Sequence, residues 1–254
     1  MLNIAIRAAH SAGDHIIRYV DRIEGMEVDT KGKNDFVTEV DRQAESIIID
    51  QLKSAYPDHA ILAEESGKTG ESEYTWVIDP LDGTTNFLHG FPQYAVSIAL
   101  LHRGVPDQAV VYDPLKQELF TASKGAGAQL NKRRIRVSRQ KRLEAALIGT
   151  GFPFGKMERL EQYLDNFRAI CPVTSGIRRA GSASLDLAYV ASGRLDGFWE
   201  YDLKTWDIAA GVLLVLEAGG AVVDMQGKED YLDSGNIIAA SPSLTGELLK
   251  ILRQ

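Results

Sequence analysis

Apolar residues recur at helical spacing in residues 2–20 and again from about residue 38 to residue 55. Thr38 with Asp41 three residues later matches a capping box, which predicts the start of the second helix. Pro57 follows the second apolar face and is expected to stop it. The chain is therefore expected to open with two packing helices.

Short apolar runs at residues 60–63 and 76–79 predict two buried strands. Pro80 lacks a backbone donor and is expected to end the pairing of the second strand. The polar segment at residues 67–73 is expected to be a loop. Further runs separated by Gly, Pro and Asp predict antiparallel strands at residues 94–101, 108–112, 118–121 and 135–137.

Beyond about Leu143 the strand and helix patterns alternate. Strands are predicted at residues 146–150, 195–201, 221–224 and 237–239, and helices at residues 158–170, 182–191, 205–219 and 244–252. Strands in runs, then helices, then strands again predict layers of α and β structure rather than a doubly wound sheet. We divide the chain into an N-terminal α+β half with a large antiparallel sheet, residues 1–142, and a C-terminal α/β half, residues 143–254, that completes the site.

Composition limits the binding partners and the cellular compartment that the sequence fits. A chain of 254 residues can bury a substantial core, and its net charge of -7 disfavours a general binder of nucleic acid or anionic membranes. Cys171 is the only cysteine, so an internal disulfide is excluded and a cytoplasmic location is expected, with Cys171 in the core. We expect no membrane span, because no stretch is long and apolar enough.

Two carboxylates bracket the end of the predicted strand at residues 76–79. Asp79 and Asp82 flank a Pro-Leu turn and can converge on one point with the backbone carbonyl of Leu81. Such an all-oxygen donor set favours Mg²⁺, Mn²⁺ or Ca²⁺ over Zn²⁺. The sequence therefore predicts a cation site at this strand end.

An anion seat follows directly, because Gly83-Thr84-Thr85 offers a flexible turn, two hydroxyls and several backbone N–H groups. Two distant acids can join the site. Glu64 ends the predicted strand at residues 60–63, and Asp207 lies in the first turn of a buried helix. Cation and phosphate would then lie side by side.

The chain resembles the inositol monophosphatase family, most closely its bacterial SuhB-type members. The resemblance rests on motifs spread over the chain, of which the second and third together are the most specific: Asp35-Phe-Val-Thr38 with Asp41, Asp79-Pro-Leu-Asp-Gly-Thr-Thr-Asn86, Trp206-Asp207-x-Ala-Ala210, Glu64-Glu65-Ser66 and Gly181-Ser-Ala183. It implies a layered α-β-α-β-α sandwich, a homodimer, and two or three Mg²⁺ ions per subunit, with Mn²⁺ able to substitute and Li⁺ inhibitory.

The resemblance also implies a role for each site residue. Glu64, Asp79 and the Leu81 carbonyl would bind one Mg²⁺, and Asp79, Asp82 and Asp207 a second. Water would be activated near Glu64 by Thr84, with Asp35 as the partner of its hydroxyl. On local pattern alone, Asp35 could instead form the turn before Thr38.

Substrate contacts are implied in the same way. The phosphate would rest on the N–H groups of Gly83 and Thr84, while Arg178 would reach the substrate or the site of the dimer partner. A polyol would be held by Asp82, the Ala183 backbone, Glu200 and Asp207. Glu200 could alternatively be a solvated carboxylate at a strand end.

Other hydrolase classes fit the sequence less well. It contains no GxxxxGK[ST] phosphate loop. Gly181-Ser-Ala-Ser-Leu185 has Ala at the nucleophile position and lacks the last glycine of a nucleophile elbow. The spacing of Asp79 and Asp82 by three residues also departs from the spacing of two in haloacid-dehalogenase phosphatases.

We therefore expect an Mg²⁺-dependent, lithium-sensitive phosphomonoesterase that releases phosphate from myo-inositol 1-phosphate. Fructose-1,6-bisphosphatase, 3'-phosphoadenosine 5'-phosphate phosphatase and histidinol phosphatase activities remain alternatives, because the family shares the metal core and the pocket rim decides. A role in transcription antitermination, as a partner of RNA polymerase, is implied by the SuhB-type resemblance alone.

A basic run at residues 132–142 stands out in this acidic chain. Alternation of Ile135 and Val137 with basic or polar residues predicts an edge strand whose charged face is in solvent. A docking patch for RNA or the transcription machinery is the other interpretation.

Overall fold

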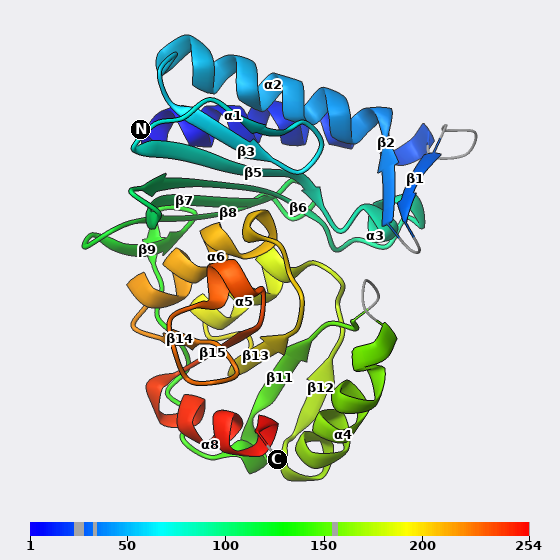
Figure 1. The fold of residues 1–254 in the computed structure, drawn as a ribbon, viewed down its shortest axis with the longest axis vertical. Coiled ribbons are helices and arrows are strands. Elements are labelled where there is room, and N and C mark those ends of the chain that lie inside the picture. Colours follow the sequence, from blue (N-terminus) through cyan, green and yellow to red (C-terminus); the bar gives the residue numbers. More distant parts are fainter. Residues whose placement is uncertain (23–27, 33–34, 154–156, 254) are drawn as a thin grey trace.

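Five layers build the molecule, which is described here from a computed structural model. The described residues are 1–22, 28–32, 35–153 and 157–253, with side chains placed outside 28–32 and 35–37. Figure 1 shows the order of the layers: an outer helix pair, a large sheet, an inner helix pair, a smaller sheet and a second outer helix pair. The predicted α-β-α-β-α sandwich is confirmed.

The first outer layer consists of α1 (Leu2–Ile17) and α2 (Glu39–Ala55). The helix α1 buries small side chains such as Ala5 and Ala9, so its backbone approaches the sheet closely. A Cβ atom added at Gly13 would lie 2.6 Å from the Tyr112 ring. The predicted capping box is present, with the Thr38 hydroxyl accepting the N–H of Val40 at 3.1 Å and the Asp41 carboxylate accepting that of Thr38 at 2.9 Å.

Eight strands form the large sheet in the described part of the chain, in the order β10-β9-β8-β7-β6-β5-β3-β4. All neighbouring strands pair antiparallel except β3 with β5, which are parallel. The strands are β3 (Ala60–Ala63), β4 (Gly67–Thr69), β5 (Tyr74–Asp82), β6 (Ala95–His102), β7 (Val105–Asp113), β8 (Glu118–Ser123), β9 (Gly127–Leu130) and β10 (Arg133–Arg134).

Three predictions about this sheet were wrong. The strand β5 does not end at Pro80: a bulge between Asp79 and Asp82 absorbs the missing N–H, and pairing resumes at Asp82 opposite Ala95. The expected loop at residues 67–73 begins with β4, which pairs with β3. The edge strand is Arg133–Arg134, just before the predicted position, and Ile135 is half-buried against the core.

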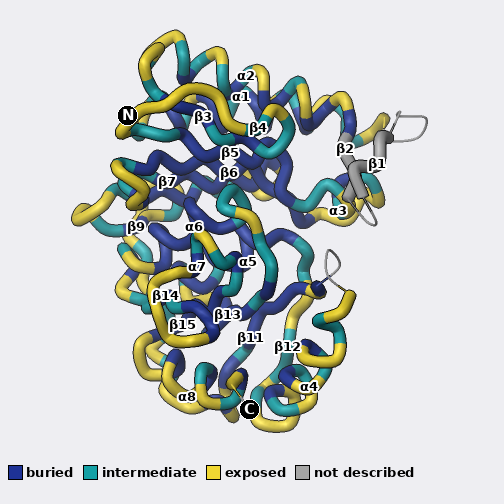
Figure 2. The backbone as a smooth tube through the Cα atoms, viewed as in Figure 1, coloured by how far each residue is buried: buried dark blue, intermediate teal, exposed yellow. Residues whose placement is uncertain are grey.

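The inner layer consists of α5 (Ala183–Ala191) and α6 (Thr205–Glu217). Figure 2 shows both helices mostly buried between the two sheets, whereas the outer helices each expose one face. Gly211 of α6 allows close packing, because a Cβ atom there would lie 2.5 Å from the Leu187 Cβ of α5. Both inner helices begin beside the end of β5 that carries Asp82.

Five strands form the smaller sheet within the described residues, in the order β12-β11-β13-β15-β14. They are β11 (Leu147–Thr150), β12 (Gly176–Arg178), β13 (Gly197–Glu200), β14 (Ala221–Val223) and β15 (Ile237–Ala240). The helices α4 (Leu160–Ile170) and α8 (Pro242–Leu252) cover its outer face.

Shorter elements complete the described chain. A ribbon of β1 (Val28–Gly32) and β2 (Asp35–Thr38) precedes α2, and the short helices are α3 (Thr84–Leu88) and α7 (Tyr231–Ser234). Single 3₁₀ turns lie at Val20–Arg22, Leu143–Ala145, Met157–Arg159 and Cys171–Val173. Cys171 is exposed, so its predicted place in the core was wrong: it opens the turn that leaves α4 on the surface. The division of the chain at residue 142 stays a prediction.

Candidate active site

Asp79 and Asp82 lie at the carboxyl end of β5, on either side of the bulge. Both are buried, at 2% and 9% exposure. The N–H of Leu81 donates to the Asp79 carboxylate at 3.1 Å, which keeps the Pro-Leu turn compact. The bulge thus places two carboxylates at one strand end, as the spacing predicted.

Glu64 reaches this strand end because β3 and β5 run parallel, with Ala63 opposite Ile78. The N–H of Glu64 donates to the Ile78 carbonyl at 3.1 Å, which extends the pairing by one residue beyond β3. Parallel strands bring their carboxyl ends to the same edge of a sheet. Glu64 therefore lies beside Asp79, although fifteen positions separate them in the sequence.

Asp207 lies in the first turn of α6, as its motif predicted. Its carboxylate accepts the N–H of Lys204 at 2.6 Å, which caps the helix. The hydroxyl of Ser97, whose residue pairs with Asp79 across β5 and β6, lies 3.4 Å from the Trp206 carbonyl. The start of α6 is thereby held over the strand end that carries Asp79.

These four acids affect one another electrostatically. Burial raises the pKa of Asp79 well above its ordinary value, and the charges of Glu64, Asp82 and Asp207 raise it further. Burial also raises the pKa of Asp207 well above its ordinary value, with Asp82 and Glu64 adding to the rise. Mutually repelling carboxylates, with Asp79 and Asp82 buried and Glu64 and Asp207 half-buried, fit a hard divalent cation such as Mg²⁺.

The geometry does not assign each ligand to a particular Mg²⁺ ion. In the ranges that the structure describes, no three acidic, histidine or cysteine side chains stand in metal-binding geometry. The predicted allocation of Glu64, Asp79, Leu81, Asp82 and Asp207 between two or three Mg²⁺ ions therefore stays a prediction.

Asp82 is held by the chain around Gly181. One of its carboxylate oxygens accepts the Ser182 hydroxyl at 2.7 Å, the Ser184 N–H at 2.7 Å and the Ser184 hydroxyl. Burial raises the pKa of Asp82, while these hydrogen bonds oppose the rise. Ser182 and Ser184 flank Ala183, the predicted substrate contact, in the same motif, but neither serine was predicted to belong to the site.

Gly83 begins the predicted phosphate seat in a left-handed conformation, with φ of 98°. A Cβ atom there would lie 2.8 Å from the Gln93 carbonyl oxygen, so only glycine fits. The Asn86 amide of α3 donates to the carbonyls of Gln93 at 2.7 Å and Ala180 at 2.9 Å. The seat is thus tied to the segment that carries Ser182, and its use by phosphate stays a prediction.

Thr84 faces Asp41 across the start of α2. Its hydroxyl lies 3.0 Å from the Asp41 carboxylate and 3.0 Å from the Leu81 carbonyl, and it can donate to one of them at a time. Burial raises the pKa of Asp41, while hydrogen bonds from Thr38 and Thr84 oppose the rise. Asp41 was predicted to cap α2 and belongs to the motif of Asp35, but its contact with Thr84 was not predicted.

Asp35 was predicted to be the partner of Thr84. Its backbone begins β2, but its side chain lies outside the described residues. That role therefore stays a prediction beside the observed contact of Thr84 with Asp41.

Glu200 lies at the carboxyl end of β13, close to the acid cluster. Burial raises its pKa well above the ordinary value, and the charges of Asp186 and Asp207 add to the rise. Gly151 makes room for it, because a Cβ atom there would lie 1.9 Å from a Glu200 carboxylate oxygen. The placement suits the predicted contact with a polyol, which stays a prediction.

Arg179, rather than Arg178, is the positive charge that affects the pKa values of Glu200 and Asp186. Its charge lowers the pKa of Glu200 and of Asp186, although burial dominates both and raises them. Its guanidinium carbon lies 5.0 Å from the centre of the Phe152 ring. Arg178 is exposed on the edge strand β12 and donates to the Ile177 carbonyl at 3.0 Å, so its predicted contact with substrate or a dimer partner stays untested.

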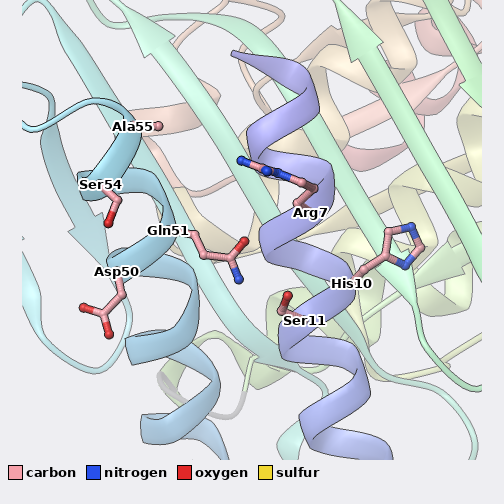
Figure 3. Close-up of a pocket in the computed structure, with 7 residues that line it drawn as sticks. All are labelled: Arg7, His10, Ser11, Asp50, Gln51, Ser54 and Ala55. Atoms are coloured by element: carbon pink, nitrogen blue, oxygen red, sulfur yellow. The ribbon is translucent and has the colours of Figure 1, made fainter.

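A separate groove of about 730 Å³ lies between the outer helices. In Figure 3, Arg7 and Ser11 of α1 and Gln51 of α2 lie between the two helices, whereas the His10 ring points away from α2. None of its lining residues belongs to the acidic motifs. This groove is therefore separate from the acid cluster.

Fold and site together define a layered α-β-α-β-α protein with a cluster of acids at one strand end. The family model of the inositol monophosphatase family matches residues 1–254. The chain belongs to the inositol monophosphatase family, and the resemblance inferred from its motifs is confirmed.

Individual relatives cover nearly the whole chain. The Nus factor SuhB of Pseudomonas aeruginosa is 54% identical, over 100% of this chain and 96% of its own. The crystal structure of the extragenic suppressor protein suhB from Bartonella henselae matches with a TM-score of 0.96 and 46% identity, covering 99% of this chain and 98% of that one. The inositol monophosphatase from Anabaena sp. PCC 7120 matches with a TM-score of 0.90 and 41% identity, covering 99% and 94%.

Of the helices in the described ranges, none combines the length and the apolar character needed to cross a bilayer.

Proposed function

We propose that the chain is an Mg²⁺-dependent phosphomonoesterase that releases phosphate from myo-inositol 1-phosphate. The observation that carries the proposal is the cluster of four acids at the end of β5. The charges of Glu64, Asp82 and Asp207 all raise the pKa of Asp79 there. Such a cluster is costly to bury unless a cation neutralises it. Membership of the inositol monophosphatase family adds the reaction class.

The residues divide the work by position. When bound, Mg²⁺ supplies Lewis acidity and lowers the pKa of water, so that hydrolysis needs no histidine base. Glu64, Asp79, Asp82, Asp207 and the Leu81 carbonyl would hold the ions.

In this proposal Thr84 and Asp41, which contact each other, orient the attacking water, and the Thr84 hydroxyl accepts its proton while passing its own to Asp41. Asp35, the partner inferred from the motif, would contribute to the same step. The N–H groups of Gly83 and Thr84 would carry the phosphate oxygens.

The sugar side of the substrate would lie toward the inner helices. Asp82, the Ala183 backbone, Glu200 and Asp207 offer acceptors for the hydroxyl groups of a polyol. Arg179 lies near enough to Glu200 to lower its pKa and can orient it. Related substrates share the phosphate and differ at this rim, so fructose 1,6-bisphosphate, 3'-phosphoadenosine 5'-phosphate and histidinol phosphate are the competing candidates.

A substrate panel tests the proposal. Phosphate release would be measured with Mg²⁺ on inositol 1-phosphate and on the three competing substrates. We expect the highest kcat/KM on inositol 1-phosphate, with Mn²⁺ able to replace Mg²⁺ and Li⁺ inhibitory where Na⁺ is not. A higher kcat/KM on another member of the panel would move the assignment to that substrate.

A second candidate function is binding to the transcription machinery, because a relative at 54% identity is named a Nus factor. The basic run offers the surface for it: Arg133 and Arg134 are exposed on the edge strand β10 of the large sheet, and Arg136 is exposed two residues after it. Pull-down of RNA polymerase at low salt would test this function independently of turnover. Homodimer formation and a cytoplasmic setting complete the proposal.

A further inference from the structure

The helix α2 carries a second buried acid, Glu45, one turn after Asp41. Residues four apart lie on the same face of a helix, so both carboxylates point to the same side. Asp41 contacts Thr84, and Glu45 is only 3% exposed. A carboxylate buried this deeply needs hydrogen-bond donors.

The donors are two successive backbone amides. One Glu45 oxygen accepts the N–H of Glu65 at 2.8 Å, and the other accepts the N–H of Ser66 at 2.9 Å. Hydrogen bonds to an ionised carboxylate are stronger than those between neutral groups. Glu45 on α2 therefore fixes the turn between β3 and β4.

This turn begins at Glu64, whose own N–H donates to the Ile78 carbonyl at 3.1 Å. The backbone is thus held on both sides of the acid, by β5 before it and by Glu45 after it. With both neighbours fixed, the Glu64 side chain leaves the backbone in a set direction, beside Asp79.

We propose that Glu45 is a positioning residue that fixes the turn at residues 64–66 and so orients Glu64 as a cation ligand. The proposal rests on the proposed function for the role of Glu64 as a ligand and for the identity of the cation. Groups that orient metal ligands typically contribute about 10- to 100-fold to metal affinity.

Amide hydrogen exchange tests the hydrogen bonds of Glu65 and Ser66 to Glu45 directly, in the metal-free protein. A cavity of about 360 Å³ bordered by Arg42, Glu45 and Ser66 reaches the turn, and Ser66 is exposed. Burial alone would therefore not protect these amides. In the metal-free wild type we expect the N–H groups of Glu65 and Ser66 to exchange at least about tenfold more slowly than those of the exposed segment 70–72.

The variant Glu45→Gln keeps the shape of the side chain but replaces one carboxylate oxygen with an NH₂ group. This group is a donor and would face a backbone N–H. We expect it to lose the protection of Glu65 and Ser66 and to bind Mg²⁺ about 10- to 100-fold more weakly in calorimetric titration. If catalysis occurs, kcat at saturating Mg²⁺ should stay near the wild-type value. The matched control is Glu39→Gln on the same helix, where the side chain is 63% exposed, and it should change neither quantity.

If Glu45→Gln does not fold, Glu45→Asp retains the charge and withdraws it from the amides by one methylene, with the same expected losses. Fast exchange of Glu65 and Ser66 in the wild type, or wild-type Mg²⁺ affinity in a folded Glu45 variant, would overturn the proposal. Failure of the wild type to hydrolyse any phosphate ester would refute the proposed function and leave the exchange result standing.

Discussion

Asp82 and Ser184 lie 102 positions apart in the chain, yet the Asp82 carboxylate accepts both the backbone N–H and the hydroxyl of Ser184. The first residue ends β5 of the large sheet, and the second lies in the first turn of the inner helix α5. The contact occupies one oxygen of Asp82 and sets the direction of the other. The orientation of this acid therefore depends on both the large sheet and the inner helix α5 being in place.

Removing the Ser184 hydroxyl should loosen Asp82 without removing its charge. For Ser184→Ala we expect Mg²⁺ affinity to fall about tenfold, with a loss of about 1 kcal/mol in the free energy of unfolding. Calorimetric titration and chemical denaturation would measure the two quantities. Ser192→Ala is the control, because that hydroxyl lies at the far end of α5 near the Tyr189 carbonyl; an equal loss of affinity in the control would contradict the prediction.

Neutralising an acid of the cluster should separate activity from stability. Asp82→Asn and Asp207→Asn each remove a charged ligand and should abolish Mg²⁺-dependent turnover while the fold is retained. Because the acids repel one another, both variants should melt at a higher temperature than the wild type without metal.

Thermal melting in EDTA and phosphate release at saturating Mg²⁺ would measure these effects. Asp50→Asn, an exposed position on α2, is the control. Near-native kcat in both cluster variants would exclude the assignment of these acids.

The pH dependence of stability has a definite sign. Burial raises the folded-state pKa of Asp79, Asp186, Glu200 and Asp207 well above their ordinary values. The folded protein therefore binds more protons than the unfolded chain above the ordinary pKa of about 4, so stability falls as pH rises through that window.

We expect the melting temperature of the metal-free protein to decrease from about pH 5 to about pH 8, and Mg²⁺ to restore it at the upper end. Scanning calorimetry in EDTA would show this trend. A melting temperature that rises over the same pH range would contradict the burial of charged acids.

The basic run permits a test that should leave the active site untouched. Arg133, Arg134 and Lys141 are exposed and lie outside the acidic motifs. Their replacement by Gln should not change phosphatase activity. If the protein also binds RNA or RNA polymerase, the triple variant should bind less tightly in low-salt pull-downs, because phosphate contacts release counterions. Unchanged binding would leave the run with its structural role at the sheet edge.

Local patterns predicted most of the elements and the acids themselves. The apolar runs of β3 and β5 and the spacing of Asp79 and Asp82 depend on neighbouring residues, which a sequence displays. The prediction that β5 ends at Pro80 was wrong because a bulge accommodates the missing backbone donor. This bulge depends on the partner strand β6.

Residues that act through distant contacts were missed. Asp41 was read as a cap because Thr38 is close in sequence, whereas Thr84 is 43 positions away. Ser182 and Ser184 meet Asp82 only after α5 packs under β5. Glu45 carried no signal at all, because its partners are backbone amides at residues 65 and 66.

The measurement that tests the central claim most directly is phosphate release from inositol 1-phosphate as Mg²⁺ is titrated, with wild type and Asp79→Asn side by side. Asp79 is the acid whose pKa responds to all three others. We predict that wild-type activity requires Mg²⁺ and saturates with it, and that Asp79→Asn is folded and inactive at every Mg²⁺ concentration. Wild-type turnover that persists in EDTA, or an active Asp79→Asn variant, would contradict the account.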